Sequence, residues 1–548
     1  MYQYRGKIKS EFIDKAKRCL EQYENEKHTL VERIKDNLSV YRQEYAQLYD
    51  KNKNSTEPKS AFILSAVENK QADFSDNFPI PNLLAREPSD EETAKLLTQI
   101  IPTILDNTEF KKVYKEHSRQ KIKKGTGIYG VFYNQAKEDI EICELDILNV
   151  FCDMHVKDIQ DSEFFFIIEY VSNSLLKEKY PHAAELFDGD TQKQGYLGTN
   201  QTVTLPHKSR IVDCYYKKND GSVHLMKMCK GNVIEATEDL AGYEDGLYKH
   251  GKYPVVFDSF YPDDDSPFGF GIIDVAKHQQ GYIDRLDGAI LKNCFRAGIP
   301  KVIVSDDSGI NPDDFADDSK EIIEAHNLNE NTYRVVDKKA LPAEVINHRN
   351  SKIVELKEFV GNRDFQQGGT ANGVTSGSAI QVLQEAGDKL SRSQIDDTYQ
   401  AYKEVVAMCI ELVREFYTEE KVYRITNELG GKEYKIFSNE MLVSQEEVRD
   451  PLGFILETKP KKVEFDISIV PQRQNVYKRE TNNQTITQLW QMGFFNPQNV
   501  DISILALKAM NFDGRDSLIQ SLTELKEQQT KQLQAVQMMQ MQQGQQIM

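Results

Sequence analysis

The sequence predicts an α+β fold with several packed parts in one elongated subunit. Apolar residues recur at three- and four-residue steps over residues 8–50 and 91–124, as in amphipathic helices. Strand-like stretches dominate residues 127–262, and two further helical stretches, 271–297 and 378–418, follow them. At 548 residues, the chain is longer than one ordinary hydrophobic core accommodates, so more than one core is expected.

The first half of the chain divides into helices and then strands. The apolar stripe of the first helix contains Ile8, Phe12, Ala16, Leu20 and Tyr23, and residues 51–70 are expected to be a polar connection. Strands are predicted at 127–133, 139–145, 163–171 and 253–262. A hairpin is predicted with its turn at Asp220-Gly221, because two-residue turns favour this pair.

The helix predicted at 271–297 carries a narrow apolar stripe with a 3.5-residue spacing, which is typical of helices packed side by side. Gly298 and Pro300 end it. Residues 298–350 then form a compact insertion with two strands and an acidic segment, and a second short helix is expected at 351–365.

An uncharged stretch, 366–377, is rich in Gly, Gln, Thr and Asn and leads into the long helix predicted at 378–418. Ser378 and Gln381 form a capping box at the start of this helix. The later apolar stripe of the helix is expected to contain Tyr402, Val405, Cys409, Leu412 and Phe416. Strands return over 419–475. The helical tail, 476–548, has only a thin apolar stripe under a Gln-rich surface, which indicates self-association or fraying rather than a core of its own.

Composition argues against several classes of protein. The formal net charge is −18, and a protein that grips a duplex normally displays clustered Lys and Arg, so tight conventional DNA binding is disfavoured. The seven cysteines include no CxxC pair, which predicts neither a disulfide framework nor a zinc site. No window is apolar enough to cross a bilayer, and the amino terminus lacks the apolar region of a signal peptide, so we expect a protein of the cytoplasm without a membrane partner.

The search for catalytic or ligand-binding motifs yields no enzyme. Gly125, Gly127 and Gly130 match GxGxxG, but a helix precedes them and a strand follows, so we expect a helix C-cap rather than a dinucleotide site. The stretch 366–377 lacks the GK[ST] ending of a phosphate loop. The acidic run 263–265, and Asp153 with His155, are interpreted as turns, although carboxylates could ligate a hard cation. No catalytic residue, metal ligand or cofactor is assigned.

The order of elements resembles the portal proteins of tailed double-stranded DNA bacteriophages, most of all those of short-tailed phages. The resemblance rests on SPFGFGIIDVAKHQQGYIDRLDGAILKN (266–293), on the return helix, and on the loop that ends in SGSAIQVLQEAGDK (376–389). Upstream, GTGIYGVFY followed by ELDILNVFCDMHVKD is also similar to portal sequences. In order of elements, the resemblance covers about residues 90 to 475.

The resemblance implies a structural, non-enzymatic subunit of a ring, typically a dodecamer, at one capsid vertex. It divides the chain into a mixed α/β wing (1–270 and 419–475), a two-helix stem (271–297 and 351–365), a clip (298–350), a tunnel loop (366–377), a long kinked helix (378–418) and a helical crown (476–548).

The resemblance to portal proteins, together with the charge of the chain, assigns candidate site residues. An acidic ring repels phosphates, while uncharged polar side chains and a few cations allow brief contacts with DNA. The expected channel residues are Gln366, Gln367, Thr370, Asn372, Thr375, Lys277, Arg285 and Lys292. The residues that neighbouring subunits are expected to bury are Ile272, Ile283, Leu286 and Ile290. The acidic clip residues Asp313, Asp314, Asp317 and Asp318 could seat basic partner surfaces, and a plain solvated helix start is the alternative.

The partners that the resemblance implies are further copies of the chain, the large terminase, a tail adaptor, the major capsid protein and non-specifically bound double-stranded DNA, in a virion assembled in the host cytoplasm. Two other hypotheses stay open: a cytoplasmic scaffold that binds proteins through its helices and Gln-rich tail, and a nucleotide-dependent enzyme with an unrecognised site. Images of the purified protein that show rings with a central hole would favour the portal, and images that show monomers or dimers would favour the scaffold. Nucleotide turnover by the chain alone would favour the enzyme.

Overall fold

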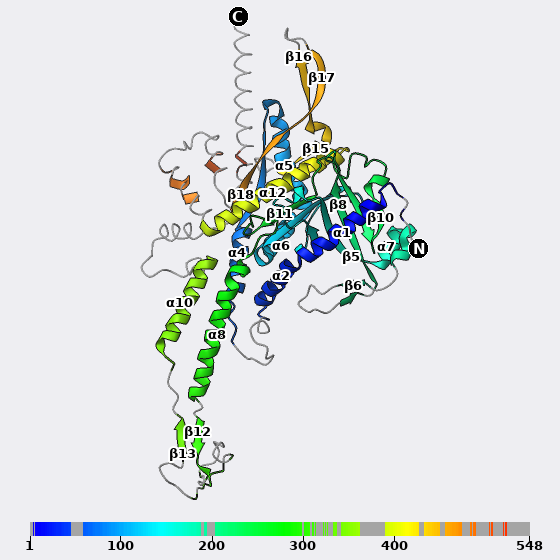
Figure 1. Cartoon of the computed structure of the whole chain (residues 1–548). Helices are drawn as coiled ribbons and strands as arrows, with labels where there is room; N and C mark the ends of the chain where they lie inside the picture. Colours follow the sequence, from blue (N-terminus) through cyan, green and yellow to red (C-terminus); the bar gives the residue numbers. More distant parts are fainter. Residues whose placement is uncertain are drawn as a thin grey trace. The chain divides into compact units, whose positions relative to one another are not determined.

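The computed structural model divides the chain into two compact units. It describes residues 4, 6–44, 58–187, 191–193, 203–205, 207–298, 301–306, 309–311, 333–336, 341–361, 389–426, 432–449 and 455–473, together with single residues between 313 and 326 and between 483 and 522. Unit 1 contains residues 1–35, 68–271 and 389–548, and unit 2 contains residues 36–67 and 272–388. Helices and strands occur in both units, which confirms the α+β class (Figure 1).

The amino-terminal helical stretch consists of two helices, α1 (Ser10–Glu26) and α2 (His28–Tyr41). Of the predicted stripe, Ala16, Leu20 and Tyr23 are buried on α1, Ile8 is buried just before it, and Phe12 is partly buried. Ile13, which was not predicted, is buried with them. These side chains pack against Phe164 and Phe166 of a five-stranded antiparallel sheet, and Figure 1 shows α1 lying across that sheet.

The sheet has the strand order β10-β9-β8-β5-β4. Its strands are β4 (Val150–Cys152), β5 (Phe164–Ser172), β8 (Lys208–Lys217), β9 (Val223–Cys229) and β10 (Asn232–Ala236). The turn between β8 and β9 contains Asp220-Gly221 as predicted, with Gly221 at a φ of 86°. The connection is longer than the predicted two residues, because β8 ends at Lys217 and β9 begins at Val223. The first five residues of β5 are buried, and apolar clusters involving both α1 and α7 (Asn173–Lys179) pack against the sheet.

A second core in unit 1 surrounds the long helix α12 (Lys389–Phe416). Of the residues predicted for its later stripe, Tyr402, Val405, Cys409 and Leu412 are fully buried and Phe416 is partly buried. Around them lie the helices α5 (Glu91–Asn107) and α6 (Phe110–Lys124) and the three-stranded sheet of β2 (Thr126–Asn134), β3 (Asp139–Glu144) and β11 (Val255–Ser259). The segment 378–388, where we predicted the start of the long helix, lies outside the described residues.

Two predictions near α6 have different outcomes. The single helical stretch 91–124 is wrong, because the chain breaks between α5 and α6, where Glu109 has a φ of 53°. The predicted C-cap is confirmed: Gly125 ends α6 in the left-handed conformation, with a φ of 94°. A Cβ atom at Gly125 would lie 2.6 Å from the carbonyl oxygen of Gly269, so the close approach of two backbones also requires glycine there.

Several elements of unit 1 were not predicted. The helix α4 (Phe62–Asp76) begins inside the supposed polar connection, and β1 (Asn77–Ala85) follows it directly. β1 contains Pro79 and Pro81, which argue against a strand, but it pairs only with β18 (Phe465–Arg473) in a two-stranded sheet. Four further strands form two hairpins, β14 (Lys421–Thr426) with β15 (Lys432–Phe437) and β16 (Val443–Arg449) with β17 (Ile455–Lys462). Short elements complete the described part: β6 (Thr191–Lys193), β7 (Val203–Leu205), and the 3-10 turns Pro88–Asp90, Ile147–Asn149, Ile159–Asp161, Pro181–Phe187, Thr237–Asp239 and Asn439–Leu442.

Unit 2 is built on two long helices, α8 (Ile272–Gly298) and α10 (Ala343–Val360), which run side by side in Figure 1. The first agrees with the predicted stem helix, 271–297. The second begins eight residues before its predicted start at 351, and Gly361 caps its end, four residues before the predicted end at 365. The first turns of α10 carry few apolar residues, so no periodic signal indicated a helix there. Residues 343–350, which we predicted as part of the clip, therefore belong to α10, and the described strands of the predicted clip are β12 (Lys301–Val304) and β13 (Tyr333–Val336).

Candidate functional site

In unit 2, one face of α8 is a row of polar side chains that hold the ends of two other helices. The side chain of Asn37 near the end of α2 donates to Asp274 at 2.8 Å, and Lys277 donates to Asn37 at 3.0 Å. One to two turns further along α8, Gln280 accepts from the backbone N–H of Ile63 at 2.9 Å, and Asp284 accepts from that of Ser60 at 2.8 Å. The two α8 side chains therefore satisfy backbone donors at the start of α4.

Helix α10 is joined to α8 by a second set of polar contacts. Arg349 donates to both carboxylate oxygens of Asp287, at 2.7 and 3.2 Å, in a bidentate pair. The hydroxyl of Tyr282 lies 3.2 Å from Nε2 of His348. The pairing fixes how the two helices are aligned along their length.

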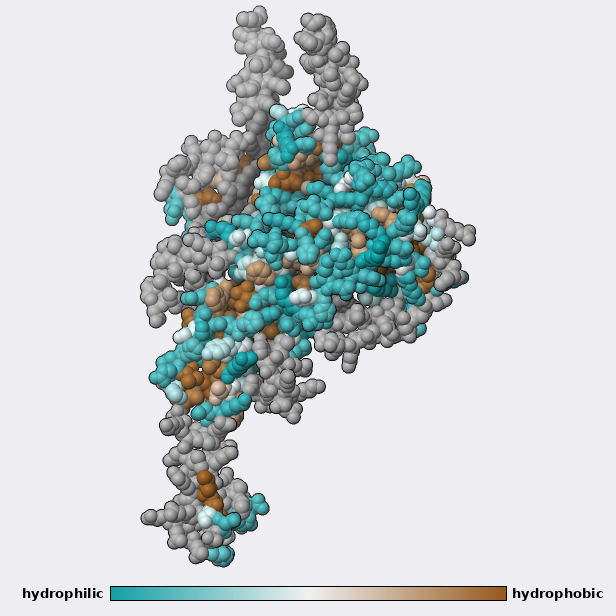
Figure 2. Space-filling view, viewed as in Figure 1, coloured by the Kyte–Doolittle hydropathy of each residue, from teal (hydrophilic) through white to brown (hydrophobic). Residues whose placement is uncertain are grey.

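The same two helices expose large apolar side chains. On α8, these are Val275, Tyr282, Leu291 and Phe295, of which Phe295 is 64% exposed, and on α10 they are Ile346, Val354 and Phe359. Figure 2 shows apolar surface over these two helices. At 100° per residue, Val275 and Tyr282 share one side of α8, whereas Leu291 and Phe295 lie on the opposite side. A single subunit thus presents two separate apolar surfaces along one helix.

The residues predicted for the subunit interface lie elsewhere on α8. Ile272 and Ile283 are 2% and 0% exposed, so their side chains are packed inside the subunit, and Leu286 and Ile290 are half-buried. The interface prediction is not tested by these positions. The exposed apolar residues of α8, namely Val275, Tyr282, Leu291 and Phe295, are different residues from the four that we predicted for the interface.

The predicted channel and clip residues are only partly within the described chain. Lys277 is half-buried against Asn37, whereas Arg285 and Lys292 are exposed and lie seven residues apart, on one side of α8. Asp313 is exposed, and its backbone N–H bonds the side chain of Asn311. Gln366, Gln367, Thr370, Asn372, Thr375, Asp314, Asp317 and Asp318 lie outside the described residues.

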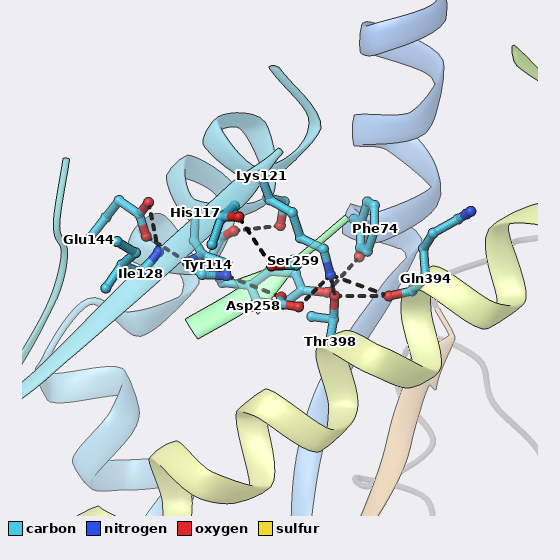
Figure 3. A network of polar contacts seen from close by, with 12 residues as sticks. Phe74, Tyr114, His117, Lys121, Ile128, Glu144, Asp258, Ser259, Gln394 and Thr398 are labelled. Carbon is cyan, nitrogen blue, oxygen red and sulfur yellow. Dashed lines mark hydrogen bonds and ion pairs between the residues drawn. The ribbon is translucent and has the colours of Figure 1, made fainter. Parts of the chain in front are cut away.

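Unit 1 contains a buried network of charged side chains that the sequence did not reveal (Figure 3). His117 of α6 stands between two carboxylates: its Nδ1 lies 2.5 Å from Glu144 and its Nε2 lies 3.2 Å from Asp258. One turn further along α6, Lys121 donates to Asp258 at 2.5 Å and to the hydroxyl of Thr398 on α12 at 2.6 Å. The side chains of His117 and Lys121 have no exposed surface.

Burial and opposite charge compete in this network, and burial still raises the pKa of Glu144 above its usual value although His117 acts to lower it. Burial by itself lowers the pKa of His117, but the carboxylates of Glu144 and Asp258 outweigh it and raise the pKa above its usual value. Burial acts to raise the pKa of Asp258, yet Lys121 and His117 hold that pKa below its usual range. With His117 protonated, two cations face two carboxylates, so the network is balanced although it is cut off from water.

The geometry of the network does not suit catalysis. It is sealed on all sides by packed residues, with the ring of His117 stacked on Tyr129 at a centroid distance of 3.5 Å. Within the described residues, no three His, Cys, Asp or Glu side chains are grouped so that they could hold a metal ion. The described helices likewise include none with the length and apolarity that a membrane span requires.

Large exposed apolar side chains such as those of α8 and α10 are typical of surfaces that contact other chains. In a comparison with protein-family models, residues 71–256 and 304–548 match the model of the phage P22-like portal proteins. Because this match covers most of the sequence, the chain belongs to the P22-like portal protein family, whose members are structural components of the virion. A search of curated proteins gives no match.

The family match and the sequence resemblance rest on partly different residues. The match includes α5, α6, α10 and α12 but leaves out residues 257–303 and therefore α8, which carried much of the resemblance. It confirms the identification as a phage portal protein. Portal proteins assemble into a ring and contact capsid and tail components, and the family is in general structural and not enzymatic.

Proposed function

We propose that this chain is the subunit of a closed ring, of about twelve copies, at one vertex of the capsid, and that the genome passes through the ring during packaging and ejection. The observation that carries the proposal is the pair of apolar surfaces on opposite sides of α8, in a chain that belongs to the portal family. A closed ring with head-to-tail contacts requires each subunit to present two different surfaces, one to each neighbour.

The interface residues follow from exposure. Val275 and Tyr282 would meet one neighbour, and Leu291 and Phe295 the other, while Ile272 and Ile283 keep α8 folded against its own subunit. Buried aromatic side chains commonly contribute the most to an interface, so Tyr282 and Phe295 are its expected anchors.

The channel would combine net repulsion of DNA with a few cations. The chain carries a net charge of −18, which limits adhesion of a polyanion to the ring. Arg285 and Lys292 share one side of α8, and we place them toward the lumen, where they partly offset this repulsion. Gln366, Gln367, Thr370, Asn372 and Thr375 remain proposed channel residues. Asp313 and the acidic residues after it would seat basic surfaces of the terminase and, later, of the tail adaptor.

Electron microscopy of the purified chain tests the ring. We expect rings with a central hole, and we expect Tyr282→Asp and Phe295→Asp each to leave monomers, because either change places a charge in the contact with one neighbour. Leu175→Asp, at a residue of α7 that is 60% exposed in unit 1, is the matched control and should still form rings. Wild-type protein that stays monomeric at all concentrations, or rings that tolerate both charged variants, would refute the proposal.

The passage of DNA has a separate test. Capsids assembled with the double variant Arg285→Gln/Lys292→Gln should contain intact rings, but the salt dependence of packaging should become weaker, because two phosphate contacts per subunit are lost. Unchanged packaging at every salt concentration would remove these two residues from the channel.

A further inference from the structure

One buried face of α12 changes its chemistry half-way along the helix. Its carboxy-terminal half buries Tyr402, Val405, Cys409 and Leu412 in an apolar core. Its amino-terminal half continues the same face with Ser391, Gln394 and Thr398, which are as deeply buried, at 4%, 8% and 1% exposed. The steps of three and four residues place all seven side chains on one stripe.

Two buried lysines contact the polar half of this stripe. Lys70 of α4 donates to the hydroxyl of Ser391 at 2.6 Å, and that hydroxyl donates to Asp73 at 2.7 Å. Lys121 of α6 donates to Thr398 and to Asp258, as described above, and lies 3.5 Å from the carbonyl oxygen of Gln394 (Figure 3). Lys70 is 5% exposed and Lys121 is 0% exposed, so both contacts are inside the protein.

From these contacts, we propose that Lys70 and Lys121 are positioning residues, and that they hold the amino-terminal half of α12 in a seat that it can leave while the carboxy-terminal half stays fixed. We call the set Lys70, Lys121, Ser391, Gln394 and Thr398 the polar seam. This inference goes beyond the proposed function and concerns the single subunit.

The physical reason is the difference between the two kinds of contact. Interdigitated apolar side chains permit one arrangement, because a shift opens gaps and loses many close contacts at once. A lysine reaches its partner through a flexible four-carbon stem, so its ammonium can follow a hydroxyl as the helix moves. Replacement of a buried charged network by apolar residues is often neutral or stabilising, which indicates that stability alone does not explain such a network.

One polar atom of the seam and one beside it lack a hydrogen-bond partner among the described residues. The side-chain oxygen Oε1 of Gln394 is buried and has no hydrogen-bond partner among the described residues, and neither does the hydroxyl of Tyr402, where the stripe becomes apolar. A buried polar atom without a partner costs free energy. The seated position of this half of the helix is therefore less favourable than one in which every buried polar atom is satisfied.

Hydrogen–deuterium exchange of the full-length wild-type protein tests the inference. We expect the backbone amides of residues 391–398 to exchange at least about tenfold faster than those of residues 402–413. Equal rates in the two halves would overturn the proposal.

A variant separates the seam from simple fraying of a helix end. Lys70→Met combined with Ser391→Ala replaces the contact between these two side chains by an apolar one and leaves Asp73, whose side chain is 32% exposed, to water. Exchange over 391–398 should slow by at least about fourfold, the factor that one buried methylene supplies. Lys403→Met makes the same chemical change on α12 at a half-buried residue outside the seam, and it should not alter this exchange. If the double variant exchanges as fast as the wild type, fraying is the explanation and the seam has no such role. Rings should form in all three proteins, so this outcome is independent of whether the chain assembles.

Discussion

Asp284 of α8 provides a quantitative test of the polar contacts in unit 2. The residue is 7% exposed, and its carboxylate accepts from the backbone N–H of Ser60 at 2.8 Å. Burial is the main cause that raises its pKa from the usual 3.8 to about 6, and the charge of Asp287 adds to the effect. Because the folded state binds the proton more tightly than the unfolded state, the free energy of unfolding falls as the pH rises from 3.8 through 6.

The substitution Asp284→Asn should remove this loss. An asparagine oxygen can still accept from Ser60 but carries no charge, so the variant should be more stable than the wild type at pH 7.5, by up to about 3 kcal/mol. At pH 4.5, where most of the wild-type carboxyl is protonated in the folded state, the gain should shrink to about 1 kcal/mol. Urea unfolding at the two pH values measures both differences.

Asp287→Asn is the matched control, one turn further along the same helix. Its carboxylate accepts two hydrogen bonds from the guanidinium of Arg349, so the substitution should destabilise the protein, by about 1 kcal/mol or more. The opposite signs of the two substitutions distinguish a carboxylate whose pKa burial raises from one that a guanidinium holds in a bidentate pair. A loss of stability for Asp284→Asn at pH 7.5, or a gain that does not depend on pH, would refute the reasoning.

Three further predictions concern unit 1. The raised pKa of His117 contributes stability that is fully present below pH 6.5 and is lost as the pH rises through the folded-state pKa, so His117→Gln should be less stable at pH 6 and should lose this pH dependence in urea titrations. Burial lowers the pKa of Lys27 to about 7, so the free energy of unfolding of the wild type should rise between pH 7 and 10. Lys27→Arg stays charged, so its free energy of unfolding should become lower than that of the wild type by up to about 4 kcal/mol over that range. A difference between the two proteins that stays constant with pH would contradict this. Gly125→Ala should lower the free energy of unfolding by about 2 kcal/mol or more, because φ is 94° there and the new Cβ would meet the Gly269 carbonyl oxygen. A change of less than about 0.5 kcal/mol, the size of a neutral surface substitution, would show that the backbone relaxes easily.

The sequence predicted those features well that depend on residues within one helix or one turn. The stripe Tyr402, Val405, Cys409 and Leu412 is a property of one helix, and it is buried as predicted. The turn at Asp220-Gly221 follows from the chemistry of two adjacent residues. By contrast, β1 contains two prolines, and only its pairing with β18, nearly 400 residues away along the chain, makes it a strand.

The apolar surfaces of α8 likewise depend partly on the local sequence and partly on tertiary packing. Sequence periodicity identified α8 as a helix with an apolar stripe, but it did not distinguish the side that packs inside the subunit from the sides that stay exposed. Ile283 is fully buried on the side of α8 between Tyr282 and Asp287, which both contact α10, whereas Phe295 is left uncovered. That assignment depends on which other segments reach the helix.

The amino-acid sequence by itself determined the α+β class, most of the helices, the acidic character of the chain and its resemblance to phage portals, because each is set by the order and composition of residues within short stretches. Only the tertiary structure decided that His117, Lys121, Asp258 and Thr398 meet, since they come from three separate segments and no local pattern links them. Buried charges are stable only next to opposite charges, and the fold alone brings those partners together.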